Sequence, residues 1–294
     1  MTGVVQMTVV STNSIALKAK ALRALGNLPP FSPILNQLMA TLAGESVSFD
    51  KLGDLMEKDT VVAGNLLRLV NSALYARRGT INSVRYALSL LGMDKVRNAV
   101  LGMSLTRMWS KAFVPQRWSM ARFDIHSAAV AILSDLLAQR LPVEYPEGAF
   151  VAGLLHDLGQ LLIATGLPEE CERIDEQGRL ASEREVLGFT HAELSAEALA
   201  VWNLPEAIQN AVLHHHNPEC DQSSKAGMIP LSAVIAASNN YLNSVGVSIA
   251  LNGDPESSDA TLVERLGLSG ERLDETIAEF RAEFEVMMKY FKQP

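Results

Sequence analysis

The chain has 294 residues, 48% of them hydrophobic, and a formal net charge of −8. This length and apolar content allow a large core, while the acidic total argues against a general nucleic-acid binder. Two distant cysteines, Cys171 and Cys220, make a disulfide framework unlikely and favour a reducing compartment.

The N-terminus shows no sign of an export or membrane segment. The first residues, MTGVVQMTVVSTNS, have neither the basic region nor the long apolar region of a signal peptide. The apolar runs elsewhere are interrupted by Arg, Asp or His before they reach the length of a membrane span. We therefore expect a soluble cytoplasmic protein with no membrane partner.

Apolar residues recur with helical period through most of the chain. In VVAGNLLRLVNSALY (61–75), one face carries Val62, Leu66, Leu69, Val70 and Leu74. No segment shows sustained alternation with β-branched residues. The sequence predicts an all-α fold without a substantial sheet.

The segment 83–105 predicts two helices separated by Gly92. Ser83 is a suitable N-cap for the first helix, and Asp94 suits the first turn of the second. Another apolar helix is expected over 127–141, because Pro142 ends the periodic pattern.

Positive charge is concentrated between Thr60 and Phe123. Ten Lys or Arg there stand against one acid, so this segment carries +9 and the rest of the chain −17. We favour solvated helix faces as the explanation, with an acidic partner or an acidic surface of the same protein as the alternative. An interaction platform on the first half would use a basic face made of Arg68, Arg77, Arg78, Arg85 and Arg97.

Pro115 and a polar linker at 251–260 suggest where the chain divides. We predict an N-terminal helical bundle over 1–113, a helical subdomain over 114–252, and a C-terminal helical extension over 253–294. The last helix has an apolar stripe, made of Leu273, Ile277, Phe280, Phe284, Met287 and Phe291. We expect the stripe to pack back on the bundle, with homodimer formation as the alternative.

All six histidines lie in the C-terminal part, from residue 126 onward, in helical stretches with apolar neighbours; they are His126, His156, His191, His214, His215 and His216. Imidazole in such surroundings is costly unless its nitrogens find partners. A single buried histidine is usually a hydrogen-bonded core residue, and the triplet alone could be an exposed helix end. The joint set, with Asp157 beside His156, favours a metal site between helices, because neutral imidazoles and a carboxylate suit iron, zinc or manganese.

The set His … His-Asp … His … His-His resembles the HD superfamily of metal-dependent phosphohydrolases. Three further stretches, 59–92, 150–163 and 191–218, resemble its signalling branch, the HDOD (HD-related output) domain. The resemblance runs from about Leu28 to Leu242. It implies a pair of helical bundles, a bacterial source and a role in signal transduction.

Transferred by this resemblance, the ligand candidates are His126, His156, Asp157, His191, His215 and His216, with Asp157 able to bridge two ions. The Asp that closes the HD pattern falls on Asn240, with Asn239 as the neighbouring alternative. Asn offers a carbonyl oxygen without charge, so it holds a hard cation less well.

Two further departures concern catalysis. Two-metal HD-GYP enzymes have an acidic ligand one turn before the first His, where this chain has Arg122. They also have a Lys where this chain has Gln160. The set with Asp157, His191, His215 and His216 keeps all its ligands, so we predict at least one bound metal, with iron expected first and manganese, zinc or nickel as alternatives.

Two functions remain open at this point. In the favoured one, the domain relays a signal by binding a protein partner or a phosphorylated or nucleotide ligand. In the alternative, it is a phosphohydrolase acting on a phosphoester or cyclic dinucleotide, with Asp157 at the catalytic metal and Arg122 as the cation for the phosphate. Arg122 could equally be a structural ion-pair partner.

Overall fold

A computed structural model describes residues 12–27, 32–42, 48–72, 80–109, 112–251 and 258–291. Within these ranges the fold is all-α, as predicted: there is no strand, and one isolated bridge joins Val143 to Ile229. The first half contains α1 (Thr12–Arg23), the short η1 (Ala24–Asn27), α2 (Pro33–Leu42), α3 (Phe49–Lys58), α4 (Thr60–Val70), α5 (Val84–Leu91) and α6 (Met93–Trp109).

The second half begins with a long central helix and continues through shorter ones. Its elements are α7 (Met120–Ala138), η2 (Pro146–Gly148), α8 (Ala149–Leu155), α9 (Leu158–Gly166), α10 (Pro168–Cys171), α11 (Arg179–Leu187), α12 (His191–Val201), α13 (Glu206–Leu213), η3 (Pro218–Cys220), α14 (Leu231–Ser244), α15 (Leu262–Arg265) and α16 (Glu271–Phe291). Both cysteines are free, as predicted.

Local signals in the first half act as the sequence predicted. The Ser83 hydroxyl caps α5 by accepting from the backbone N–H of Tyr86, and Gly92 separates α5 from α6 with a positive φ of 81°. That φ favours glycine because a Cβ would clash with the backbone. The buried face of α4 carries Val62, Leu66 and Val70, whereas Leu74 lies outside the described residues.

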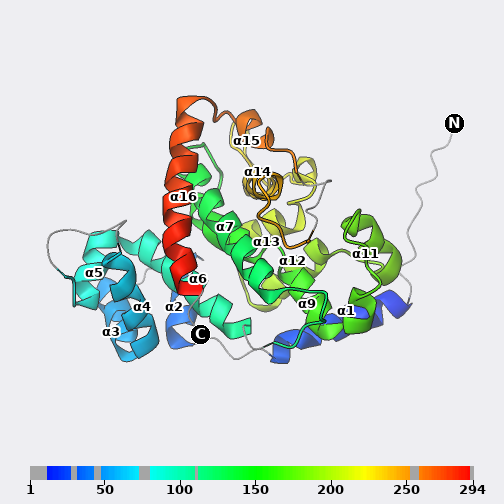
Figure 1. Cartoon of the computed structure of the whole chain (residues 1–294), viewed down its shortest axis with the longest axis horizontal. Coiled ribbons are helices and arrows are strands. Elements are labelled where there is room, and N and C mark those ends of the chain that lie inside the picture. The colour runs from blue at the N-terminus through cyan, green and yellow to red at the C-terminus, as the bar shows by residue number, and fades with distance from the viewer. Residues whose placement is uncertain are drawn as a thin grey trace.

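The helices form two groups on either side of α7 (Figure 1). α2–α5 lie at one end of the molecule, and α9, α12 and α13 lie on the other side of α7. α16 runs along α7, and α1 crosses to the second half, where it lies against α9. The predicted boundary near residue 113 falls in the connection between α6 and α7.

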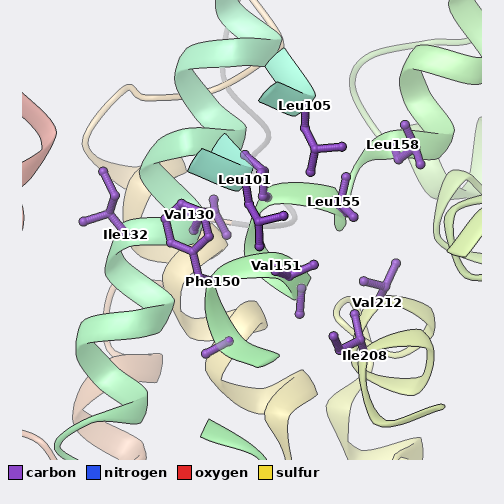
Figure 2. Close-up of a cluster of buried hydrophobic side chains, with 14 of the residues drawn as sticks. Leu101, Leu105, Val130, Ile132, Phe150, Val151, Leu155, Leu158, Ile208 and Val212 are labelled. Carbon is purple, nitrogen blue, oxygen red and sulfur yellow. The ribbon is translucent and has the colours of Figure 1, made fainter. Parts of the chain in front are cut away.

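One hydrophobic core runs through both groups. Figure 2 shows Leu101 and Leu105 of α6 close to Val151 and Leu155 of α8, with Val212 of α13 on the far side. These side chains are almost completely buried. The first-half bundle therefore supports the helices that carry the histidines.

The apolar stripe of α16 packs inward, as we expected. Ile277 and Phe280 are buried, and Phe284 and Met287 are partly buried against the core. The side chain of Phe291 is outside the described part of the chain.

Several cations of the basic segment are satisfied within the chain. Arg85 pairs with Asp50, Asp54 and Glu57, and Lys95 pairs with Glu283. Arg97 is only 5% exposed, so it does not belong to the basic surface predicted for the first half. Arg77 and Arg78 of that predicted surface lie outside the described residues.

Contrary to the expectation from the sequence, one stretch among the described residues, Pro146–Gly166, has the length and apolar composition of a membrane span. Of its most apolar window, 94% is buried inside the fold. The stretch contains α8, α9 and the His156–Asp157 pair, so it is the central core segment of the second half.

Candidate metal centre

Asp157 lies at a break in the chain between two buried helices. α8 ends at Leu155, His156 and Asp157 form a turn, and α9 begins at Leu158. His156 is 0% exposed and Asp157 4%. A helix break places these polar side chains at the crossing of α8 and α9 with α7 and α12.

The remaining histidines arrive from three other segments. His126 lies in the middle of α7, and His191 is the first residue of α12. Thr190 and Glu193 form a capping box that fixes the start of α12. His215 and His216 follow α13 in a turn.

Two glycines allow these helices to approach closely. A Cβ on Gly153 would lie 2.8 Å from the Cα of Ala131 on α7, and a Cβ on Gly159 would lie 2.0 Å from the carbonyl oxygen of His191. Real Cβ atoms do not come so close to backbone. Glycine at these two places therefore brings the His156–Asp157 turn against α7 and α12.

Four histidines are held by the same kind of contact, which uses Nδ1 and leaves Nε2 for the site. Nδ1 lies 2.8 Å from the carbonyl of Val247 in His126, 2.8 Å from that of Gly153 in His156, and 2.6 Å from that of Val212 in His215. Nδ1 of His191 lies 2.8 Å from Oε2 of Glu183. These oxygens accept hydrogen bonds, so Nδ1 carries a proton, and Nε2 presents a lone pair when the ring is neutral.

The four Nε2 atoms converge on the Asp157 carboxylate. The distances are 3.2 Å from His156 and 3.8 Å from His126 to Oδ2, and 3.0 Å from His191 and 3.7 Å from His215 to Oδ1. Nε2 of His216 lies 2.9 Å from Nε2 of His191.

This convergence suits a bound cation. Nε2 of His156, Nε2 of His215 and Oδ1 of Asp157 are buried without a hydrogen-bond partner. Lone pairs that face a carboxylate repel it, and unpaired buried polar atoms are costly. A metal ion would satisfy several of these atoms at once, so the donor set fits the metal that the sequence predicted.

The donors separate into two sets that share Asp157. One set contains His126, His156 and Asp157, and the other contains Asp157, His191, His215 and His216; within each set the donor atoms lie within 4.8 Å of one another. This grouping has the arrangement expected for two neighbouring ions bridged by one carboxylate.

Three histidines of the cluster have lowered pKa values. Burial lowers the pKa of His126 to about 4 and that of His216 to about 3, and neighbouring histidines act in the same direction. Burial also lowers the pKa of His215. Low pKa values keep these rings in the neutral form that binds metal.

His191 and Asp157 behave differently because they face opposite charges. Burial would lower the pKa of His191, but the charge of Glu183 and the contact with Asp157 raise it to about 10. Burial would raise the pKa of Asp157, but His156 and His191 hold it well below its usual value. Two carboxylates thus demand a positive charge here, which a proton on His191 or a metal ion supplies.

Glu183 is a functional candidate that the sequence analysis missed. It is 0% exposed and accepts hydrogen bonds from both the backbone N–H and Nδ1 of His191. Carboxylates in this position orient metal-binding histidines and make them more basic. Arg179, Glu183 and Leu187 are buried on one face of α11, and this helical spacing was the available signal.

The structure corrects the placement of two predicted site residues. The side-chain amide of Asn240 donates to the carbonyl of Ala236 and accepts from the backbone N–H of Asp259, so it is engaged outside the cluster. The neighbouring alternative, Asn239, is 3% exposed and lines the cavity beside His126. Asn239 therefore occupies the place predicted for Asn240.

Arg122 is also held elsewhere. Its guanidinium donates to the carbonyl of Ala250 at 2.7 Å, and it does not line the cavity at the cluster. Arg179 is the cation on that wall instead. This contact is structural, as in the alternative left open by the sequence, but the partner is a backbone carbonyl and not the expected ion-pair partner.

The family model of the HDOD domain matches residues 28–218 of this chain. The chain belongs to the HDOD domain family. The fold is also similar to that of an HDOD domain protein of unknown function from Geobacter sulfurreducens, with 23% identity, a TM-score of 0.69, and coverage of 95% of this chain and 98% of that one.

Two further HDOD-like structures carry functional names. A proposed signal transduction protein from Marinobacter aquaeolei is 21% identical, with a TM-score of 0.69 and coverage of 97% of this chain and 67% of that one. A proposed phosphohydrolase from Shewanella amazonensis is 22% identical, with a TM-score of 0.68 and coverage of 92% and 98%. At these identities the likeness shows the fold.

An uncharacterized protein from Treponema pallidum is 22% identical over 242 residues, which cover 78% of this chain. The match spans 45% of that relative's length.

Proposed function

We propose that this HDOD protein is a bacterial, cytoplasmic signal-transduction protein that binds at least one metal ion and acts by binding a protein partner or a small ligand. The observation that carries the proposal is the convergence of four Nε2 lone pairs on the buried carboxylate of Asp157. The same fold in a proposed signal transduction protein from Marinobacter aquaeolei supports the signalling role.

The metal would hold together the segments of the second half that carry its donor side chains. α7, the turn between α8 and α9, α12 and the turn after α13 each contribute donors, so ligation would stabilise their relative positions. Iron is the metal we expect, with manganese, zinc or nickel as alternatives, because imidazole and carboxylate donors suit all of them.

Three side chains favour a binding function over a phosphohydrolase activity. Asn239 lies where a second acid would hold a metal, and Arg122 lies where the two-metal HD-GYP enzymes have an acidic ligand. Gln160, which lines the cavity, replaces their Lys. Because these positions lack charged donors, metal binding should be weaker at the set with His126 than at the set with His191.

A phosphohydrolase is the second candidate, because Asp157 belongs to both donor sets. A metal held there would lower the pKa of a bound water and prepare it to attack phosphorus. The chain's own residues would hold Asp157 between the two sets.

The deciding experiment measures metal per chain by elemental mass spectrometry after purification without chelator. The samples are the natural chain, Asp157→Ala, and Asp274→Ala as a matched control with an exposed carboxylate on α16. About one ion per chain, lost only in Asp157→Ala, with no turnover on a panel of phosphoesters and cyclic dinucleotides, is the expected result. A metal content near zero in the natural chain would contradict the proposal, and two ions with turnover that needs Asp157 would establish the phosphohydrolase.

A further inference from the structure

A second cavity lies between α6, α7 and α16, the long helix that runs along α7 in Figure 1. Its walls also include Leu69 of α4 and Phe150 of α8, so it joins the N-terminal bundle to the second half. The cavity measures about 50 Å³, which is room for roughly four water-sized groups. Among the described residues it shares no lining side chain with the cavity beside Asp157, so it is separate from the metal centre.

Small residues on α6 leave this space open. Ala99 lines the cavity, and Gly102 follows it on the same helix. A Cβ on Gly102 would lie 3.4 Å from the ring of Phe150 and 3.9 Å from the sulfur of Met287. Most of the remaining wall is apolar and is made of Leu69, Met103, Ile132, Phe150, Val286 and Met287. An apolar wall with a few polar groups is the usual lining of a site for a small organic ligand.

Two acids and one lysine form the charged part of this wall. Lys95 pairs with Glu283 at 3.2 Å. Within the part of the chain that the structure describes, the carboxylate of Asp135 makes no ion pair, and its hydrogen bonds come from the side chains of Gln139, at 2.7 Å, and Asn98. With both acids ionised, the wall therefore carries one negative charge more than positive charges.

The carboxyl group of Asp135 is short of positive charge. Burial raises its pKa to about 6, and nearby Glu283 acts in the same direction. Arg97 opposes the rise, but it does not line the cavity, and its ion-pair partner is Asp94, at 3.3 Å. A cation inside the cavity would supply the missing charge next to apolar side chains.

We propose that this cavity binds a small organic cation, a primary ammonium group on a short apolar chain. The ammonium would donate to Asp135, and charge-assisted hydrogen bonds of this kind are the strong ones. The apolar chain would lie between Ile132 and Phe150. The inference does not depend on the metal, although α7 carries both Asp135 and the metal-ligand candidate His126.

Titration of n-propylammonium into the chain as purified, followed by NMR of methyl-labelled methionine, tests the proposal. Met103 and Met287 line the cavity, whereas Met56 is buried in α3 and serves as the internal control. We expect saturable shifts of the first two methyl signals and none of the third. n-Propanol, which has a similar shape but no charge, should bind more weakly.

Four variants test the contacts. Asp135→Asn should weaken propylammonium binding by about tenfold or more and leave propanol binding unchanged. Asp274→Asn, at an exposed acid of α16, is the matched control and should change neither. Lys95→Gln should strengthen propylammonium binding, because it removes the one cationic side chain of the wall among the described residues. Ala99→Leu should weaken the binding of both ligands, because its larger side chain fills the cavity.

The site is overturned if the Met103 and Met287 signals do not shift with saturation, or if Met56 shifts equally. The choice of a cation is overturned by equal affinities for propylammonium and propanol, or by unchanged propylammonium affinity in Asp135→Asn. Unchanged or weaker binding in Lys95→Gln has the same meaning. If Ala99→Leu does not fold, Asp135→Asn decides. Metal per chain, measured on the same samples, tests the proposed function separately.

Discussion

The N-terminal bundle and the centre of the second half bury opposite kinds of side chain. In α2–α5 the buried residues are apolar, and charges lie outside, where Arg85 faces three carboxylates of α3. Around α8 and α9 the most buried positions include His156, Asp157, Glu183 and His191.

The two regions differ in what their buried side chains need for stability. An apolar core is stabilised by removal of surface from water and needs no partner atom. A buried imidazole or carboxylate is tolerated only with a partner, so the unpartnered Nε2 atoms of His156 and His215 beside Asp157 suit a cation. The predictions below test this contrast.

The largest expected loss of stability comes from a substitution where α9 and α12 approach closely. Gly159→Ala places a Cβ 2.0 Å from the carbonyl of His191, and we expect a loss of about 3 kcal/mol or more in the free energy of unfolding. Gly64→Ala in α4, where a Cβ meets nothing within 4 Å, should stabilise by about 0.5–1 kcal/mol. Urea unfolding of both variants measures the contrast, and a stable Gly159→Ala would show that the helices are not held this close.

The next effect concerns Glu183. Glu183→Gln removes the charge that holds Nδ1 of His191, so we expect metal affinity to fall by about 10- to 100-fold. Equilibrium dialysis with the purified metal measures the affinity. Glu185→Gln, an exposed change on the same helix, is the control. Equal affinities in the two variants would mean that Glu183 supports the fold and not the metal.

A partly buried acid away from the centre, Asp135, gives a smaller, pH-dependent effect. Burial, with Glu283 nearby, raises the pKa of Asp135 to about 6, against the opposing contacts of Asn98, Arg97 and Gln139. The folded chain therefore holds this proton more tightly than the unfolded chain, so stability falls as the pH rises from about 4 to about 6.

Asp135→Asn should remove that slope and raise stability at pH 7 by about 1–2 kcal/mol. Thermal unfolding from pH 4 to pH 8 measures it. An unchanged slope would assign the pH dependence to other groups.

The smallest effect is expected on the surface of the bundle. Arg85→Gln breaks its contacts with Asp50, Asp54 and Glu57, but these groups are solvated, so the loss should stay within about 1 kcal/mol and shrink in high salt. Chemical unfolding at low and high salt measures it. A larger loss that salt leaves unchanged would show that this network is more than surface charge pairing.

Several residues show which features could be predicted from the sequence and which could not. Ser83, Gly92 and the face of α4 were predicted from local spacing, because caps and helical periodicity depend on neighbours in the chain. Asn239 and Asn240 could not be separated in this way. One residue turns a helix face by about 100°, and only the packing of α14 shows which amide faces the cavity.

Glu183 and Arg179 were missed for a related reason. In RLASEREVLGFTH (179–191) they look like other charged residues of a surface helix, and their burial depends on the position of α11 against His191 and the metal cavity. Arg122 was misplaced because its distance from His126 along the helix says nothing of Ala250, 128 residues away in the chain.

The sequence by itself determined the all-α class, the family resemblance and the set of histidines, because these follow from residue types and short-range periodicity. The tertiary structure decided which nitrogen of His126, His156, His191 and His215 faces Asp157, which carboxylate supports His191, and which arginine lines the cavity. Those outcomes depend on contacts between helices far apart in the chain, and a helix carries no information about its partner's rotation until both are packed.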